Sequence, residues 1–259
     1  MSVDLHNHTI LCNHATGSVE EYVKKAIEEK IKYFGFSDHA PMNYDPKYRM
    51  SFKQMNEYEN SILHVKKKYE KNLHVLLSYE VDFLEGYIDE RVLKAKVDYL
   101  IGSVHFIGKW GFDNPEFIGE YKNKDINKIW EEYFEAIENL AKSRLFDIVG
   151  HIDLIKVFNF LPTKDIREIA KGAIKEIKKA NMVVEINAAG YRKPVKEAYP
   201  SSDILEMLAQ NDIPITFCSD AHAPEQIGFK KEEMHLFAKS YGYNKCATFI
   251  DKERIMVNF

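Results

Sequence analysis

The sequence predicts an α/β fold in which about seven parallel strands form a barrel covered by helices. Seven short apolar runs alternate with segments of helical periodicity, which is the pattern of a parallel sheet. The runs are continuously apolar, as expected of strands that helices cover. Six of the seven end in His, Glu or Asp, and in a barrel these ends share the face where active sites form. An open, doubly wound sheet is the alternative, but no Gly-x-Gly-x-x-Gly motif follows a strand.

The first half of the chain contains four of the expected strands, at 3–8, 33–39, 73–83 and 98–105. Residues 18–21 read Ser-Val-Glu-Glu, the pattern of a capping box at a helix start, and apolar residues at helical spacing follow as far as Ile31. Residues 51–54 give a second such signal before the next helix. A helix of about ten residues is expected before residue 98.

The second half contains three further strands, expected at 146–151, 182–187 and 214–220. Apolar spacing predicts helices over 126–141, 163–180, 201–210 and 231–241, and a weak strand at 247–250. The segment 106–121 holds three glycines and a proline, which makes it too irregular for a helix, and loops of this length are often functional. No repeat or linker interrupts the chain, so we expect residues 1–259 to form one domain.

Composition and charge argue against several classes of protein. The 36 basic and 40 acidic side chains leave a formal charge of -4, without the clustered basic face that binds nucleic acid. Three widely spaced cysteines argue against a disulfide framework and for a reducing compartment. No apolar stretch reaches membrane-spanning length, and the N-terminus lacks a signal-peptide pattern. We therefore expect a cytoplasmic protein without nucleic-acid or membrane partners, of open oligomeric state.

Metal-ligating side chains gather at the ends of the expected strands. His6 and His8 lie two residues apart on the first strand, so both imidazoles point the same way. Alone, they could be ordinary core or surface histidines. However, seven of the ten histidines fall at or beyond strand ends: His6, His8, His14, His39, His105, His151 and His222. Glu80 and Asp220 occupy equivalent positions, so a metal site is predicted there. The other three histidines, His64, His74 and His235, are interpreted as structural or solvated.

Together these residues resemble the motifs of the polymerase-and-histidinol-phosphatase (PHP) family of metal-dependent phosphoesterases. The matching segments are Asp4-Leu-His-Asn-His8, His14, Ser37-Asp-His39, Glu80, Ser103-Val-His105, Gly150-His151 and Ser219-Asp-Ala-His222. They extend from residue 4 to residue 222, so the resemblance covers most of the chain. It implies a distorted seven-stranded, TIM-like β/α barrel, in agreement with the strand count.

The resemblance also implies three divalent cations with overlapping ligand sets. The first would be held by His6, His8, Glu80 and Asp220, the second by the bridging Glu80 with His105 and His151, and the third by His14, His39 and His222. Imidazole and carboxylate ligands are compatible with zinc, iron and manganese. Three such cations would make the pocket strongly positive in spite of the acidic chain, which suits a phosphate dianion.

Two segments narrow the resemblance to histidinol phosphate phosphatases. They are 104–115, with Val-His-Phe and Trp-Gly-Phe-Asp-Asn-Pro, and 187–201, with Asn-Ala-Ala-Gly-Tyr-Arg-Lys-Pro and Tyr-Pro-Ser. Ala188 departs from the pattern, since a hydroxyl residue is commoner there. The implied reaction is hydrolysis of L-histidinol phosphate to L-histidinol and phosphate, a step of histidine biosynthesis. Glu80 and Asp220 would help to hold the first two metals. A hydroxide bridging these metals would attack the phosphorus in line with the bond to the leaving alcohol.

Further residues are predicted to act on the substrate. Arg192, with Lys193 beside it, is the candidate phosphate clamp because a guanidinium matches two phosphate oxygens, and a solvated loop arginine is the alternative. His39 or a metal-bound water would protonate the leaving group. Residues that would close over the imidazole and amine, unless they form a small satellite core, are Trp110, Phe112, Asp113, Glu116 and Phe117. Asp38 and Glu185 are expected either to orient imidazoles or to form buried salt bridges.

Three other functions remain open from the sequence. A hydrolase of the same chemistry could act on another phosphoester, such as a nucleotide or a nucleic-acid end. An amidohydrolase-type barrel also opens with His-x-His on its first strand, but it has no use for the His14, His39 and His222 group. A non-enzymatic metal-binding module would be expected to have a small, closed site.

Overall fold

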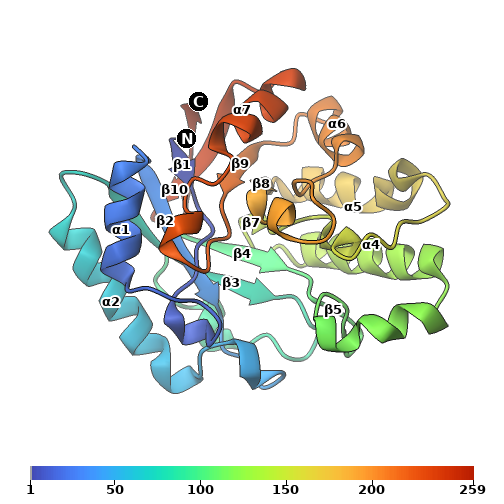
Figure 1. Ribbon diagram of the computed structural model, residues 1–259, viewed down its shortest axis with the longest axis horizontal. Coiled ribbons are helices and arrows are strands. Elements are labelled where there is room, and N and C mark those ends of the chain that lie inside the picture. The colour runs from blue at the N-terminus through green and yellow to red at the C-terminus, as the bar shows by residue number, and fades with distance from the viewer. Residues whose placement is uncertain (1) are drawn as a thin grey trace.

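The computed structural model describes residues 2–259 and shows a barrel of parallel strands surrounded by helices (Figure 1). Seven strands follow the order β1-β2-β3-β4-β7-β8-β9, and every neighbouring pair is parallel. They are β1 Val3–Asp4, β2 Tyr33–His39, β3 His74–Asp82, β4 Tyr99–Ser103, β7 Ile148–Val149, β8 Val183–Asn187 and β9 Ile215–Cys218. The barrel closes after β1, where Leu5 N donates to Phe217 O at 3.1 Å and Asn7 forms a parallel bridge with Ala221. The predicted barrel is confirmed.

Helices cover the outside of the barrel. They are α1 Val19–Glu28, α2 Met55–Lys68, α3 Glu90–Leu93, α4 Ile126–Ser143, α5 Ile166–Ala180, α6 Ser202–Gln210 and α7 Lys231–Ser240. In Figure 1, α1 and α2 flank the strands on the left, while α4 and α5 lie on the right. The capping box predicted at Ser18 is present, since Glu21 N donates to Ser18 Oγ and Ser18 N donates to Glu21 Oε2.

The interior of the barrel is filled so closely that β2 has no room for a side chain at Gly35. A Cβ atom there would lie 1.8 Å from Tyr99 Oη and 3.0 Å from Leu5 O. The hydroxyl group of Tyr99 occupies this space and donates to Leu5 O, which ties β4 to the segment following β1. Tyr99 is completely buried, so the barrel is a packed core and not a channel.

A C-terminal hairpin covers the N-terminal ends of the strands. It consists of β10 Lys245–Ile250 and β11 Glu253–Asn258, which pair antiparallel. Thr216 Oγ1 of β9 donates to Ala247 O at 2.8 Å, and Asp251 N donates to Asp98 Oδ1 at 3.1 Å, just before β4. The opposite, C-terminal ends of the strands are therefore the ones available to form a site.

Several elements differ from the prediction. The strand expected over 3–8 pairs with β2 only at Val3–Asp4, and the one expected over 146–151 is reduced to β7. The ten-residue helix expected before residue 98 is the four-residue α3. The segment 106–121 is more regular than expected, with the hairpin β5 Phe106–Ile107 and β6 Trp110–Gly111 before the 3-10 helix Pro115–Asn123. Strand β11 was not predicted, because its apolar run is only three residues long, Ile255 to Val257, and is largely exposed.

Within residues 2–259, no helix combines the length and apolar character needed to cross a membrane.

Candidate metal centre and active site

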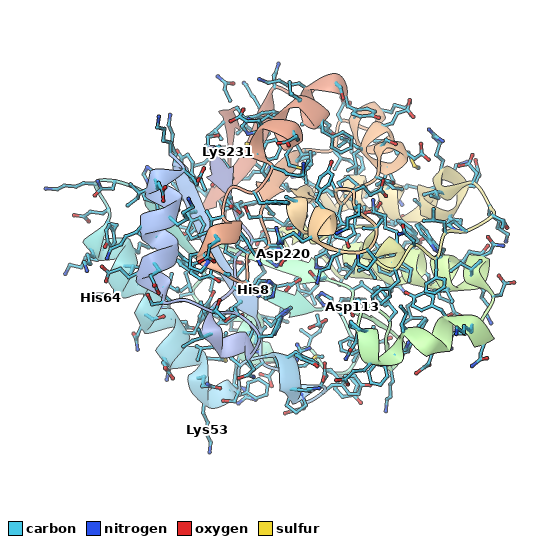
Figure 2. All side chains as sticks on the ribbon, viewed as in Figure 1. His8, Lys53, His64, Asp113, Asp220 and Lys231 are labelled. Carbon is cyan, nitrogen blue, oxygen red and sulfur yellow. The ribbon has the colours of Figure 1, made fainter. Side chains whose placement is uncertain are left out.

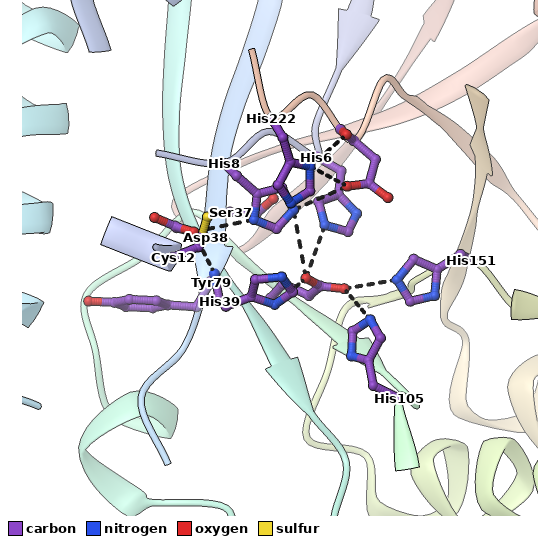
Figure 3. Close-up of polar contacts among 12 residues, drawn as sticks. His6, His8, Cys12, Ser37, Asp38, His39, Tyr79, His105, His151 and His222 are labelled. Carbon is purple, nitrogen blue, oxygen red and sulfur yellow. Dashed lines mark hydrogen bonds and ion pairs between the residues drawn. The ribbon is translucent and has the colours of Figure 1, made fainter. Parts of the chain in front are cut away.

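The end of β3 places Glu80 among four imidazoles. These belong to His6, His39, His105 and His151, which converge in Figure 3. Glu80 Oε2 lies 3.3 Å from His6 Nε2 and 2.8 Å from His39 Nδ1. The other oxygen, Oε1, lies 2.9 Å from His151 Nε2 and 3.6 Å from His105 Nε2. Because the carboxyl ends of all barrel strands share one face, residues from four different strand ends meet at a single carboxylate.

Three groups of side chains are close enough to hold a cation each. In every group, one N or O atom per residue lies within 4.8 Å of the others. The groups are His6–His8–Glu80, Glu80–His105–His151 and His14–His39–His222. They match the three expected sets, with Glu80 shared. Asp220, the remaining expected ligand, lies beside the first group, with its Oδ1 3.1 Å from His8 Nε2. A further overlapping group, His8–Cys12–His222, includes a thiol.

The site contains buried polar atoms that lack a hydrogen-bond partner in the described part of the chain. They include His6 Nε2, His39 Nδ1 and Glu80 Oε2, all facing the centre. Leaving such atoms unpaired costs about 1–3 kcal/mol each, so folded proteins rarely leave several together. A cation accepts lone pairs from both imidazole nitrogen and carboxylate oxygen. The donor atoms present therefore fit divalent metal ions.

Carboxylates behind the ligands fix the orientation of three imidazole rings. His6 Nδ1 lies 3.0 Å from Glu185 Oε2, and His8 Nδ1 lies 3.2 Å from Asp38 Oδ1. Both contacts agree with the orienting role considered for Asp38 and Glu185. The third contact, between His105 Nδ1 and Asp82 Oδ1 at 2.6 Å, was not predicted. Such partners hold the ring so that the opposite nitrogen faces the metal.

The charges of the site stabilise the ligand forms of its carboxylates. Burial alone would raise the pKa of Glu80, but the nearby His6, His39 and His105 hold it well below its usual range. The pKa of Asp220 is lowered for the same reason, against the effect of burial. Burial lowers the pKa of His39 to about 4, so this imidazole is neutral at physiological pH. The same carboxylates raise the pKa of His6, His8 and His105, so these rings would release a proton when they bind a metal, which requires ionised carboxylates and neutral imidazoles.

A cavity of about 760 Å³ opens above the ligand groups. Figure 2 shows His8 and Asp220 in the middle of the molecule, with Asp113 across from them. Of the residues predicted to contact a substrate, the cavity is lined by Asp113, Phe117, Arg192 and Lys193. The prediction for Trp110 and Phe112 is corrected: both are buried and neither lines the cavity, because the hairpin turns alternate side chains to opposite faces. They belong to the main hydrophobic core and not to a small satellite core.

Arg192 and Asp113 both line this cavity. Arg192 Nη2 donates to Ser219 O and Asp220 O, both at 2.8 Å, which holds the guanidinium beside the ligand Asp220. Its Nη1 is buried without a hydrogen-bond partner among the described residues. Burial raises the pKa of Asp113, although His105 and Lys193 oppose this shift. The cavity lining therefore includes a guanidinium beside the ligand Asp220 and a separate carboxyl group.

A comparison with protein families decides between the barrels considered above. The profile of the PHP domain matches residues 4–189, more than half of the chain. The chain belongs to the PHP family. Its barrel and its Glu80-centred histidines agree with this membership, which replaces the amidohydrolase-type alternative. Asp220 and His222 lie beyond the matched residues, yet barrel closure brings them to the same site.

Relatives of this PHP protein are named for a phosphatase activity. A Deinococcus radiodurans protein named "Probable histidinol-phosphatase" is 39% identical over 232 residues, covering 88% of each chain. A Schizosaccharomyces pombe protein of the same name is 28% identical over 271 residues, covering 95% of this chain and 87% of the relative. The crystal structure of histidinol phosphate phosphatase from Lactococcus lactis, complexed with zinc, L-histidinol and phosphate, superposes with a TM-score of 0.82. That structure is 20% identical and covers 98% of both chains, so it supports the fold.

Several residues of this PHP site are not evident from the sequence alone. The loop between β2 and α2 contributes Tyr44, Tyr48 and Arg49 to the cavity wall, and no motif in this loop indicated that role. Tyr199 also lines the cavity. For Asp82 a signal did exist, because it lies two residues after Glu80 on β3 and therefore faces the same way.

Proposed function

We propose that this PHP protein is a metal-dependent phosphatase that hydrolyses L-histidinol phosphate to L-histidinol and phosphate. The observation that carries the proposal is the cavity itself, with the Glu80-centred ligand groups and Arg192 at one part and Asp113 at another. This layout suits a small molecule with a phosphate at one end and a cationic group at the other. The name of the 39% identical Deinococcus relative supports the same substrate.

We propose three divalent ions of zinc, iron or manganese, held by the three groups around Glu80, with Asp220 as a further ligand of the first. When bound, such ions supply Lewis-acid chemistry: they lower the pKa of water toward neutrality and offset charge on phosphate oxygens. In His6, His8 and His105, Nδ1 lies beside a carboxylate, and in His151 it is buried in the core. Nε2 is therefore the nitrogen of each ring that would bind a metal. Metal identity follows from availability as well as affinity.

The chain's own residues would bind and orient the substrate. Arg192 would donate through its free Nη1 to a phosphate oxygen, with the exposed Lys193 as a second cation. Asp113 would accept from the ammonium or imidazolium group, and Phe117 would cover the ring. His39 is not retained as the proton donor to the leaving group, because its pKa of about 4 leaves it without a proton to give at neutral pH. We assign it only to the ligands.

The first experiment measures phosphate release from L-histidinol phosphate beside nucleotides and sugar phosphates, using protein purified without chelator. We expect a strong preference for L-histidinol phosphate that a chelator abolishes and added Mn²⁺, Zn²⁺ or Fe²⁺ restores. Release from another ester alone would keep the phosphoesterase and discard the substrate. Absence of release from every ester, with metal bound, would favour a non-enzymatic metal-binding module.

Asp113→Asn tests the proposed recognition of the cationic end. The change preserves size and removes the charge, and a hydrogen bond to a charged group contributes about 1.5–3 kcal/mol. We therefore expect kcat/KM for L-histidinol phosphate to fall about 10–100-fold. Activity on an uncharged monoester such as phenyl phosphate should change little. An equal loss on both substrates would contradict a role for Asp113 in recognition.

The chain, over 1–259, would act as one phosphoesterase domain in the cytoplasm, on a small-molecule substrate and without nucleic acid.

A further inference from the structure

Arg49 is a buried arginine in the loop between β2 and α2, and the function proposed above gives it no role. Only 4% of its side chain is exposed, although it also borders the cavity. Its Nη1 lies 2.7 Å from Asp82 Oδ2, in an ion pair that is buried on both sides. Burying two charged groups costs free energy that their mutual attraction does not necessarily repay. Stability alone therefore does not account for this buried ion pair.

The partner of Arg49 connects it to the metal groups. Asp82 uses its second oxygen, Oδ1, to contact His105 Nδ1 at 2.6 Å. His105 Nε2, on the other side of the ring, faces Glu80 Oε1 at 3.6 Å. Arg49, Asp82 and His105 thus form a continuous chain that ends in the Glu80–His105–His151 group. Every link is a direct side-chain contact within the described residues.

We propose that Arg49 is a positioning residue, which fixes the Asp82 carboxylate and through it the orientation and tautomer of His105. This inference rests on the proposed function, since it concerns retention of a cation by the Glu80–His105–His151 group. An ionised Asp82 can only accept, so the metal-binding form of His105 keeps its proton on Nδ1 and presents Nε2 toward Glu80. With Arg49 removed, the carboxylate loses one of its two fixed contacts and is free to rotate away.

The same guanidinium shapes the wall of the cavity. Arg49 Nε donates to Asp45 O at 2.8 Å, and Nη1 also contacts Ala40 O at 3.3 Å. The loop held in this way carries Tyr44 and Tyr48, which line the cavity. The planar fork of arginine allows one side chain to reach a carboxylate and two carbonyls, which a lysine ammonium cannot do with equal geometry. Arg49 therefore links metal retention to the shape of the substrate pocket.

Three variants separate these two effects. Arg49→Gln removes the charge, Asp82→Asn breaks the link to His105, and Arg49→Lys keeps a cation beside Asp82. The matched control is Lys66→Gln, which removes the cation paired with the buried Asp98 at 2.9 Å, near the opposite ends of the strands. Metal per chain is measured by elemental analysis, and metal loss is timed after addition of a chelator. Circular dichroism reports the fold.

We expect Arg49→Gln and Asp82→Asn each to lose metal about 10–100-fold faster than wild type, as for other changes behind metal-bound histidines. The double variant should lose metal no faster than either single variant, since both act on one contact. Arg49→Lys should retain most of its metal and still show a raised KM for L-histidinol phosphate. Lys66→Gln should behave as wild type.

The outcomes distinguish this inference from the proposed function. A wild-type protein that binds no metal would remove the proposed function itself. Wild-type metal retention by both Arg49→Gln and Asp82→Asn would overturn the positioning role, as would additive losses in the double variant. If Arg49→Gln fails to fold, Asp82→Asn and Arg49→Lys still test the positioning role. Wild-type metal retention by Asp82→Asn would show that His105 does not depend on Asp82 or on Arg49.

Discussion

Replacing Glu185 with Gln changes one atom at the meeting point of three contacts and leaves the side-chain volume nearly the same. Glu185 Oε1 accepts from His151 N and from Asn187 Nδ2, both at 2.7 Å, while Oε2 lies 3.0 Å from His6 Nδ1. Burial by itself would raise the pKa of Glu185. The charge of His6 and the hydrogen bonds outweigh this effect, so the pKa lies below its usual value. The ionised carboxylate can only accept, so the metal-binding form of His6 carries its proton on Nδ1 and presents Nε2 toward Glu80.

A glutamine at this position has one acceptor and one donor. With its amide nitrogen toward His151 N and Asn187 Nδ2, it would leave two buried donors unpaired, at about 1–3 kcal/mol each. We therefore expect the amide nitrogen to face His6 Nδ1, which must then pass its proton to Nε2. The resulting N–H points at Glu80 Oε2, 3.3 Å away, and cannot bind a cation. Stability without metal should change by about 1 kcal/mol, whereas metal affinity should fall about 10–100-fold.

Two measurements check this reasoning for Glu185→Gln. Urea unfolding of chelator-treated protein gives the free energy of unfolding, and titration against a competing metal indicator gives the affinity. Glu168→Gln, a change on the exposed side of α5, is the control. Metal affinity equal to that of wild type would refute the tautomer argument. A loss of more than about 3 kcal/mol without metal would show instead that Glu185 holds the barrel together.

Two further predictions concern the fold. Gly35→Ala would bring a Cβ atom within 1.8 Å of Tyr99 Oη, so we expect urea unfolding to show a loss of about 1–3 kcal/mol in the free energy of unfolding. The control Gly119→Ala, where no atom lies within 4 Å, should change this free energy little. Equal losses in the two variants would contradict the packing argument. Burial lowers the pKa of His235 to about 4, so the neutral ring stabilises the fold fully above about pH 6.5 and this contribution falls as the pH decreases toward 4. His235→Gln should reduce the stability difference between pH 7.5 and 4.5 by about 1–2 kcal/mol, allowing for partial exposure, and an unchanged difference would assign the acid sensitivity elsewhere.

Much of the fold followed from the sequence because its signals are local. The capping pattern at Ser18 and the continuous apolar run of β2 depend on neighbouring residues, and both are present as predicted. Short elements were less predictable. Strand β7 pairs through only two residues, Ile148 and Val149, although its neighbours β4 and β8 each have five. The apolar run alone could not reveal that limit.

The substrate pocket shows most clearly where residue type alone is insufficient to predict which side chains face a ligand. Trp110 and Phe112 were grouped with Asp113 because aromatic side chains suit a ring-shaped ligand. The hairpin gives alternate residues opposite directions, so Trp110 and Phe112 pack into the core while Asp113 faces the cavity. Arg49 gave the opposite difficulty. A loop arginine resembles a solvated residue in sequence, and only its contact with Asp82 distinguishes it.

The sequence by itself determined the kinds of donor atoms and their positions at the ends of strands. His-x-His on the first strand and acidic or imidazole groups after later ones were sufficient to predict a metal-binding barrel. The tertiary structure decided which nitrogen of each ring faces Glu80 and which carboxylate stands behind it. The physical reason is barrel closure: it brings residues between 6 and 222 into hydrogen-bond distance, and contacts so distant in sequence leave no local pattern.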